Sequence, residues 1–157
     1  MTKVPEYWNR AKKYLSKKDK TMSKLIRNYQ SPSEIILTSR KDIFFSLCKS
    51  IIGQQISVAA ADSVFLKFKE KCRNKINAQT VSKLTFSQIK KCGLSRLKVV
   101  GIKSLAKQFL DKTFNPKLIN RMDDEEAIKY LSNLRQIGRW SAEMLSLIHI
   151  SEPTRRK

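Results

Sequence analysis

The chain has 157 residues, 41% of them hydrophobic, which suits one folded domain and excludes a disordered tail. Its 33 Lys and Arg stand against 13 Asp and Glu, and a formal net charge of +20 predicts an anionic partner, with nucleic acid favoured over a membrane surface and a merely basic soluble protein as the alternative. No apolar run reaches membrane-spanning length and the start lacks a signal peptide's apolar middle, so we expect a cytoplasmic protein with no membrane partner.

Taken in chain order, the apolar spacing predicts an all-α fold. Only 4 Gly and 4 Pro occur, and no run alternates polar and apolar residues for long. Helices are predicted over residues 6–17, 22–28, 42–53, 58–72, 81–84, 86–91, 97–111, 124–135 and from 141 onward. Polar joints such as SPSE, NAQT and FNPK separate them. The acidic run 123–126 is expected to open a helix, where carboxylates favour the positive end of the dipole.

The first conspicuous feature is GQQIS, residues 53–57. Gly53 interrupts the helical spacing, so two helices are expected to meet there at a tight corner. An ordinary helix–helix core explains the apolar residues around it, but not the adjacent amides of Gln54 and Gln55. Residues 65–107 then carry twelve Lys or Arg against one acid, Glu70.

The cysteines and the histidine predict no metal site. Cys48, Cys72 and Cys92 lie 24 and 20 residues apart, which fits neither a zinc ligand set nor an iron–sulfur cluster. We expect reduced, partly buried thiols. His149 is the only histidine and cannot bind a metal by itself.

The most informative stretch is EEAIKYLSNLRQIGRWSAEML. An apolar helix runs into Ile137 and Gly138, and a second helix begins near Trp140. Such a turn leaves free backbone N–H groups at one exposed point, able to hold a DNA phosphate and a cation beside it. The arrangement resembles the helix-hairpin-helix motif, with an ordinary helical hairpin as the alternative. Gln136 stands where the motif commonly has glycine, so a non-glycine residue is expected at a tight position.

Together with DIFFSLCKSIIGQQISVAAADSVFLKF and GLSRLKVVGIKSLAKQFL, this stretch resembles the compact bacterial 3-methyladenine DNA glycosylases of the type II, AlkA-like branch. These belong to the helix-hairpin-helix DNA glycosylase superfamily, and the resemblance runs from Tyr7 to about Leu145. It implies a monomeric repair enzyme of the bacterial cytoplasm and nucleoid. Such an enzyme flips an alkylated purine out of double-stranded DNA and hydrolyses its N-glycosidic bond, without a required cofactor.

The resemblance also implies roles for matching positions. Gln55 falls where members insert a side chain into the gap left by the flipped nucleotide, and Gln54 would support the corner. The hairpin would hold backbone phosphate, with room for a monovalent cation at its backbone. The implied DNA-binding residues are Gln54, Gln55, Ser57, Ile137, Gly138, Arg139 and Ser141.

Trp140 stands where strand-cutting members have a Schiff-base lysine, so water is expected to attack the sugar. The implied base pocket is Trp140, stacked on a positively charged alkylated purine, with Met144 on the same wall. The alternative for Trp140 is a core aromatic. The catalytic aspartate of the family lies roughly twenty residues further on, in a Pro-x-Asp-Asp stretch. No Asp follows Asp124, so we expect no catalytic residue in this chain and no activity from it.

The last residues predict a foreign tail. LSLIHISEPTR, residues 145–155, is also the translation of a sequence that looks like the transposon-end adapter of sequencing libraries. We therefore expect one all-α domain over residues 1–144, truncated before the catalytic Asp, and a non-native tail over 145–157. The alternative function is a non-catalytic helix-hairpin-helix DNA-binding module. A basic RNA-associated protein would leave GQQIS and IGRWSAEM unexplained.

Overall fold

The computed structural model describes residues 7–29, 42–119 and 121–149, and within these ranges all regular structure is helical. The all-α prediction is therefore confirmed. Internal contacts divide the chain into two units, residues 1–39 and 40–157. The single domain over residues 1–144 stays a prediction. None of the helices in the described ranges is long and apolar enough to cross a bilayer.

The first unit is a pair of short helices, α1 (Tyr7–Lys18) and α2 (Lys20–Asn28), which contact each other. Asp19 separates them, and its carboxylate accepts a hydrogen bond from the Met22 N–H at 2.8 Å, which starts α2. No residue of either helix is buried, and Tyr14 and Leu25 are among the exposed apolar side chains.

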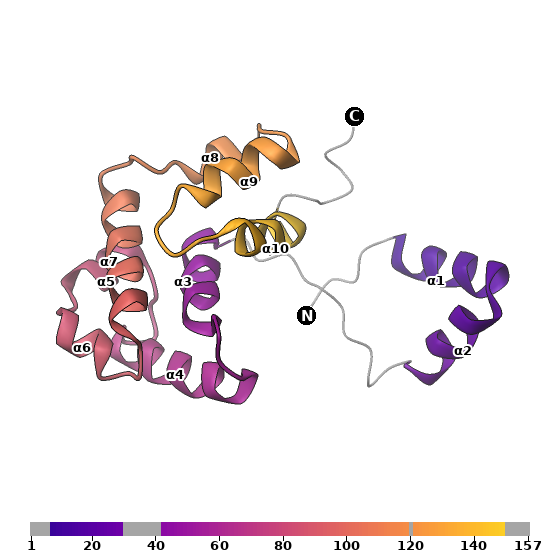
Figure 1. Cartoon of the computed structure of the whole chain (residues 1–157), viewed down its shortest axis with the longest axis horizontal. Coiled ribbons are helices and arrows are strands. Elements are labelled where there is room, and N and C mark those ends of the chain that lie inside the picture. The colour runs from indigo at the N-terminus through magenta and orange to yellow at the C-terminus, as the bar shows by residue number, and fades with distance from the viewer. Residues whose placement is uncertain (1–6, 30–41, 120, 150–157) are drawn as a thin grey trace. The chain divides into compact units, whose positions relative to one another are not determined.

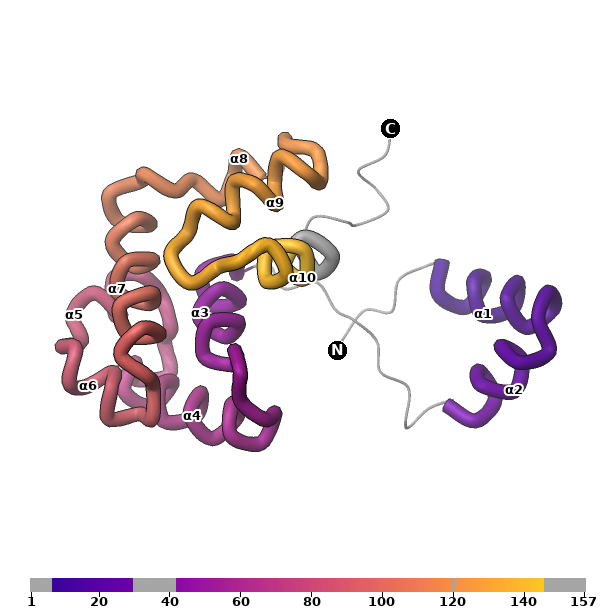
Figure 2. Tube along the Cα trace, in the orientation of Figure 1, coloured from indigo at the N-terminus to yellow at the C-terminus, as the bar shows by residue number. Residues whose placement is uncertain are grey.

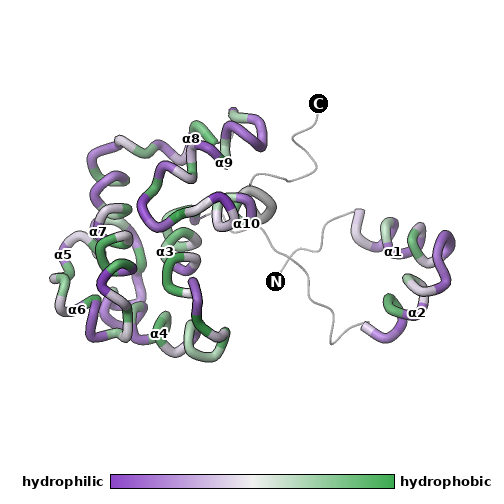
Figure 3. The backbone as a smooth tube through the Cα atoms, viewed as in Figure 1, coloured by the Kyte–Doolittle hydropathy of each residue, from purple (hydrophilic) through white to green (hydrophobic). Residues whose placement is uncertain are grey.

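The second unit is built around α3 (Ile43–Gly53), which contacts α4, α7 and α10 (Figure 1). Most of α3 is apolar, as Figure 3 shows, and Leu47, Cys48 and Ile51 are fully buried. Its other helices are α4 (Val58–Lys71), α5 (Ala78–Lys83), α6 (Phe86–Lys90), α7 (Arg96–Leu110), α8 (Pro116–Ile119), α9 (Asp124–Ser132) and α10 (Arg139–His149).

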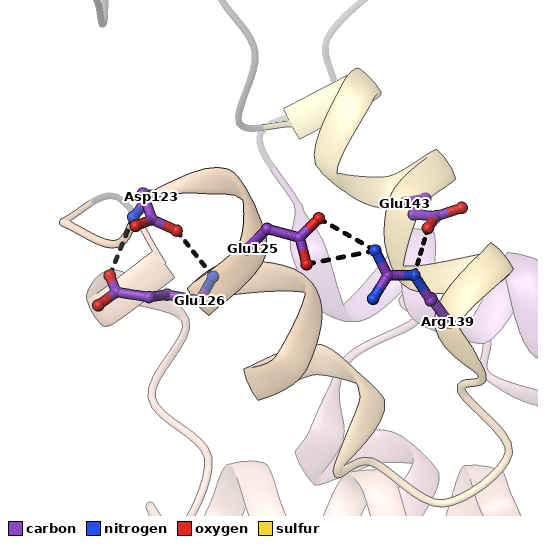
Figure 4. Close-up of polar contacts among 5 residues, drawn as sticks. All are labelled: Asp123, Glu125, Glu126, Arg139 and Glu143. Carbon is purple, nitrogen blue, oxygen red and sulfur yellow. Dashed lines mark hydrogen bonds and ion pairs between the residues drawn. The ribbon is translucent and has the colours of Figure 1, made fainter.

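Side-chain caps explain where most of these helices begin. At the start of α9, the Asp123 carboxylate accepts from the Glu126 N–H, and the Glu126 carboxylate accepts from the Asp123 N–H (Figure 4). The expected structural role of the acidic run is thus confirmed. The residues whose side chains accept at a helix N-terminus are Asp19, Asp42, Ser57, Asn77, Thr85, Ser95 and Asp123.

Of the predicted joints, SPSE lies outside the described residues, and the other two are partly helical. Helix α8 begins inside FNPK at Pro116, because proline has a preset φ and its missing N–H is not needed in a first turn. The Asn115 side chain accepts from the Lys117 N–H at 3.1 Å and supports that turn. Inside NAQT, Asn77 caps α5, which therefore begins three residues before the predicted start.

The three cysteines are free, as expected of reduced thiols, but they are almost completely buried rather than partly buried. Burial raises the pKa of the Cys48 thiol well above its ordinary value and that of Cys72 to about 11. These thiols are therefore protonated and unreactive in the folded chain at neutral pH.

The predicted tail is only partly described. Leu145 is buried in the core, α10 continues to His149, and residues 150–157 lie outside the described ranges. The non-native origin of residues 145–157 stays a prediction.

Candidate nucleic-acid interface

The predicted corner between α3 and α4 is present, and the chain passes through it from the end of α3 into α4 (Figure 2). Gln55 is exposed and has a φ of 56°, in the left-handed region that non-glycine residues rarely adopt. Ser57 closes the corner, because its hydroxyl accepts from the Ala60 N–H at 3.3 Å. The side chain that the resemblance assigns to the DNA gap therefore lies at a solvent-facing bend.

The hairpin between α9 and α10 is a second tight turn. Gln136 has a φ of 68°, so the expectation of a non-glycine residue at a tight position is confirmed. Ile137 is 3% exposed and anchors the turn in the core. Its N–H donates to the Leu134 carbonyl at 3.0 Å, which removes this N–H from those available to a phosphate.

The start of α10 differs from that of the capped helices. Gly138 is its N-cap, since the Gly138 carbonyl accepts from the Ala142 N–H at 3.0 Å, but glycine has no side chain to accept from the first turn. Among the described residues, no hydrogen bond engages the N–H groups of Gly138, Arg139 and Trp140. A Cβ added at Gly138 would meet nothing within 4 Å. Donors and open space together suit an anion.

The Gln54 side chain joins the corner to the hairpin. Its Nε2 donates to the Gln136 carbonyl at 2.6 Å and lies 3.5 Å from the Ser141 hydroxyl. Ser141 lies in the first turn of α10 and is 5% exposed, so its hydroxyl faces the interior. Its predicted contact with DNA therefore depends on its backbone N–H. The structure thus brings together two turns that lie more than 80 residues apart in the sequence.

Helix α7 supports both turns, which sequence reasoning missed. The Lys98 ammonium donates to the Ile52 carbonyl at 2.9 Å and to the Gln54 carbonyl at 2.7 Å, and partial burial lowers its pKa. Gly101 lies against the hairpin, because a Cβ there would come within 2.7 Å of the Gln136 Cγ. The only available signal was GLSRLKVVG, which places a lysine and a glycine on one face of a helix.

The Arg139 side chain is paired with carboxylates rather than left free (Figure 4). Its Nε donates to Glu143 at 2.7 Å and its Nη2 to Glu125 at 3.0 Å. Hydrogen bonds to Glu143 and Glu125 raise the guanidinium pKa, and all three side chains are exposed to solvent. The predicted role of Arg139 in holding phosphate therefore depends on its backbone N–H. Sequence reasoning did not identify these two carboxylate partners.

Trp140 lies on the surface, with 71% of the residue exposed, so the alternative of a core aromatic is wrong. It occupies the first turn of α10, two residues after the N-cap Gly138. Met144, one helical turn further on, is half-buried. Their spacing of four residues puts both on one face of α10, and their role as a base pocket stays a prediction.

The profile described as "HhH-GPD superfamily base excision DNA repair protein" matches residues 48–154. The chain is 27% identical over 135 residues to Schizosaccharomyces pombe "DNA-3-methyladenine glycosylase 1", covering 84% of this chain and 58% of that protein. It is 31% identical over 153 residues to Saccharomyces cerevisiae "DNA-3-methyladenine glycosylase", covering 88% and 51%. The chain thus spans somewhat more than half the length of these two relatives.

A solved structure agrees with the fold. The S. pombe 3-methyladenine DNA glycosylase Mag1 in complex with abasic DNA superposes with a TM-score of 0.76 and 24% identity, covering 90% of this chain and 70% of that one. At this identity the likeness supports the fold alone. The family match covers both turns and α7, and more than half of the chain. The chain therefore belongs to the HhH-GPD superfamily of base excision DNA repair proteins.

Proposed function

We propose that the protein acts in base excision repair as a monofunctional DNA glycosylase of the 3-methyladenine II, AlkA-like type. It releases alkylated purines from double-stranded DNA by hydrolysing the N-glycosidic bond after base flipping. The relatives named as 3-methyladenine DNA glycosylases support the substrate class. We expect this activity of the protein that carries the family aspartate, which the resemblance places roughly twenty residues beyond Trp140.

The uncapped start of α10, directly beside the exposed Trp140, carries the proposal. The N–H groups at Gly138 and Arg139 would hold a phosphate, while the Gln55 corner, fixed to the hairpin through Gln54, would enter the duplex. An electron-rich indole stacks well on a purine that carries a positive charge after alkylation. Because tryptophan has no amine, the sugar would be attacked by water rather than by the protein.

A base-release assay on methylated duplex DNA tests the proposal. We expect the 157-residue chain to bind DNA and to release no base, since a carboxylate is needed to stabilise the oxocarbenium-like sugar. Base release by this chain would contradict the placement of the catalytic aspartate. Sequencing the source locus past the Met144 codon supplies the extended protein and shows whether LSLIHISEPTR is encoded. The extended protein should release 3-methyladenine, and substituting Asn for its family aspartate should abolish release.

The alternative is a non-catalytic DNA-binding module. The exposed hairpin and the net charge of +20 support this module as well as they support a glycosylase. It predicts salt-sensitive binding, with no base release from the extended protein. An extension that contains Pro-x-Asp-Asp and releases base would exclude it.

A further inference from the structure

Two lysines of α7 make the same kind of contact in different places. Lys98 donates to the Ile52 and Gln54 carbonyls at the end of α3, at 2.9 and 2.7 Å. Lys103 donates to the Ser82 and Leu84 carbonyls at the end of α5, both at 2.8 Å. A cation at these positions satisfies carbonyls that a helix end leaves without an intrahelical donor. Both side chains are partly buried, so as helix caps the two lysines are equivalent.

Their surroundings differ, because only Lys98 touches the candidate interface. The Gln54 carbonyl that accepts from Lys98 belongs to the peptide bond that leads into Gln55, with its φ of 56°. The Gln54 amide then donates to the carbonyl of Gln136, with its φ of 68°. Left-handed non-glycine residues persist only where the surrounding structure holds them. Gln54 is the link between two such residues, and Lys98 fixes its backbone.

We infer that Lys98 is a positioning residue for base flipping: through Gln54 it keeps the Gln55 corner and the phosphate-holding hairpin at one fixed spacing. The inference rests on the proposed function. A side chain that enters the duplex and a turn that holds the backbone must act on the same DNA, so a small error in their spacing weakens damage recognition. Lys98 itself need not touch DNA for this role.

The matched substitutions are Lys98→Met, which keeps the length of the side chain without its donors, and Lys103→Met, which removes the same contacts elsewhere. Hydrogen exchange of the chain without DNA comes first. In Lys98→Met, residues 53–57 should exchange at least about tenfold faster, with no change there in Lys103→Met. Unchanged exchange of residues 53–57 in Lys98→Met would overturn the inference, whatever the DNA result.

The second measurement is the ratio of affinities for a duplex with a tetrahydrofuran abasic site and for the intact duplex. We expect Lys98→Met to lower this ratio about tenfold, Lys98→Arg to restore most of it, and Lys103→Met to leave it within about twofold. If wild type prefers the abasic duplex and Lys98→Met shows the same affinity ratio, the inference is overturned. If wild type shows no preference for the abasic duplex, both the proposed function and the role of Lys98 in flipping fail. Hydrogen exchange then still decides whether Lys98 holds residues 53–57 in place.

Discussion

Substitution of Gly138 separates stability from DNA binding, because serine there should change them in opposite directions. The φ of Gly138 lies outside the left-handed region, and a Cβ would meet no atom within 4 Å, so a side chain fits without strain. A serine hydroxyl at this N-cap can accept from the first turn of α10, as Ser57 and Ser95 do in α4 and α7. We expect Gly138→Ser to gain a few tenths of a kcal/mol, and Gly138→Ala to lose about 0.5–1 kcal/mol.

For DNA the two Gly138 variants should behave alike. Either side chain occupies the open space in front of the free N–H groups, and the serine hydroxyl would also accept from the Ser141 N–H, as Ser57 and Ser95 accept from the residue three positions on. A hydrogen bond to a charged phosphate contributes about 1.5–3 kcal/mol. Loss of one such bond weakens binding about tenfold or more. The dissociation constant for duplex DNA should rise by this factor in both variants.

Fluorescence anisotropy with a labelled duplex at one salt concentration measures the affinity, and thermal unfolding measures stability. The melting temperatures should fall in the order Ser, Gly, Ala, with Gly138→Ser about 1 °C above wild type and Gly138→Ala about 2–5 °C below. A Gly138→Ser variant that binds as tightly as wild type would refute the assignment of the phosphate to this helix start. Affinities that follow the melting temperatures would refute it equally.

Three further substitutions test other parts of the structure. Trp140→Ala should change the unfolding free energy by less than about 0.5 kcal/mol, because the ring is exposed. In competition binding it should nevertheless lower the preference for alkylated over unmodified duplex. A preference equal to that of wild type would contradict the base-stacking role. Gly101→Ala should weaken DNA binding, because the added Cβ displaces Gln136 and with it the hairpin. This effect is expected although alanine favours a helix over glycine by about 1 kcal/mol. An affinity equal to that of wild type, measured by anisotropy, would show that the hairpin adjusts freely. The raised pKa of Cys72 stabilises the fold below the ordinary thiol pKa, and this contribution is lost as pH rises from about 9 to about 11. Urea unfolding across this range should therefore show a steeper decline in wild type than in Cys72→Ala, and parallel declines would contradict the shift.

Local features of the fold could be predicted because each depends on neighbouring residues. The interruption at Gly53 marked the corner, and Gln136, in place of the glycine common in the motif, predicted a non-glycine residue at a tight position, where the structure has a φ of 68°. Helix α8 was missed because its four residues carry no apolar period, and its start depends on Pro116. The contacts of Lys98 and Gly101 join residues 35 to 46 positions apart, so no local pattern could reveal them.

The pairing of Arg139 with Glu125 and Glu143 bears on how the protein would search a genome. The guanidinium of Arg139 is already neutralised by these two carboxylates. A hairpin that holds phosphate through neutral N–H groups alone displaces few counterions when it binds DNA. The salt-dependent attraction would then come from lysines elsewhere on the chain, which act at any sequence. Attraction to DNA in general and arrest at one nucleotide would thus depend on different groups. Such a division would let the protein leave undamaged DNA quickly while still stopping where the helix is weakened.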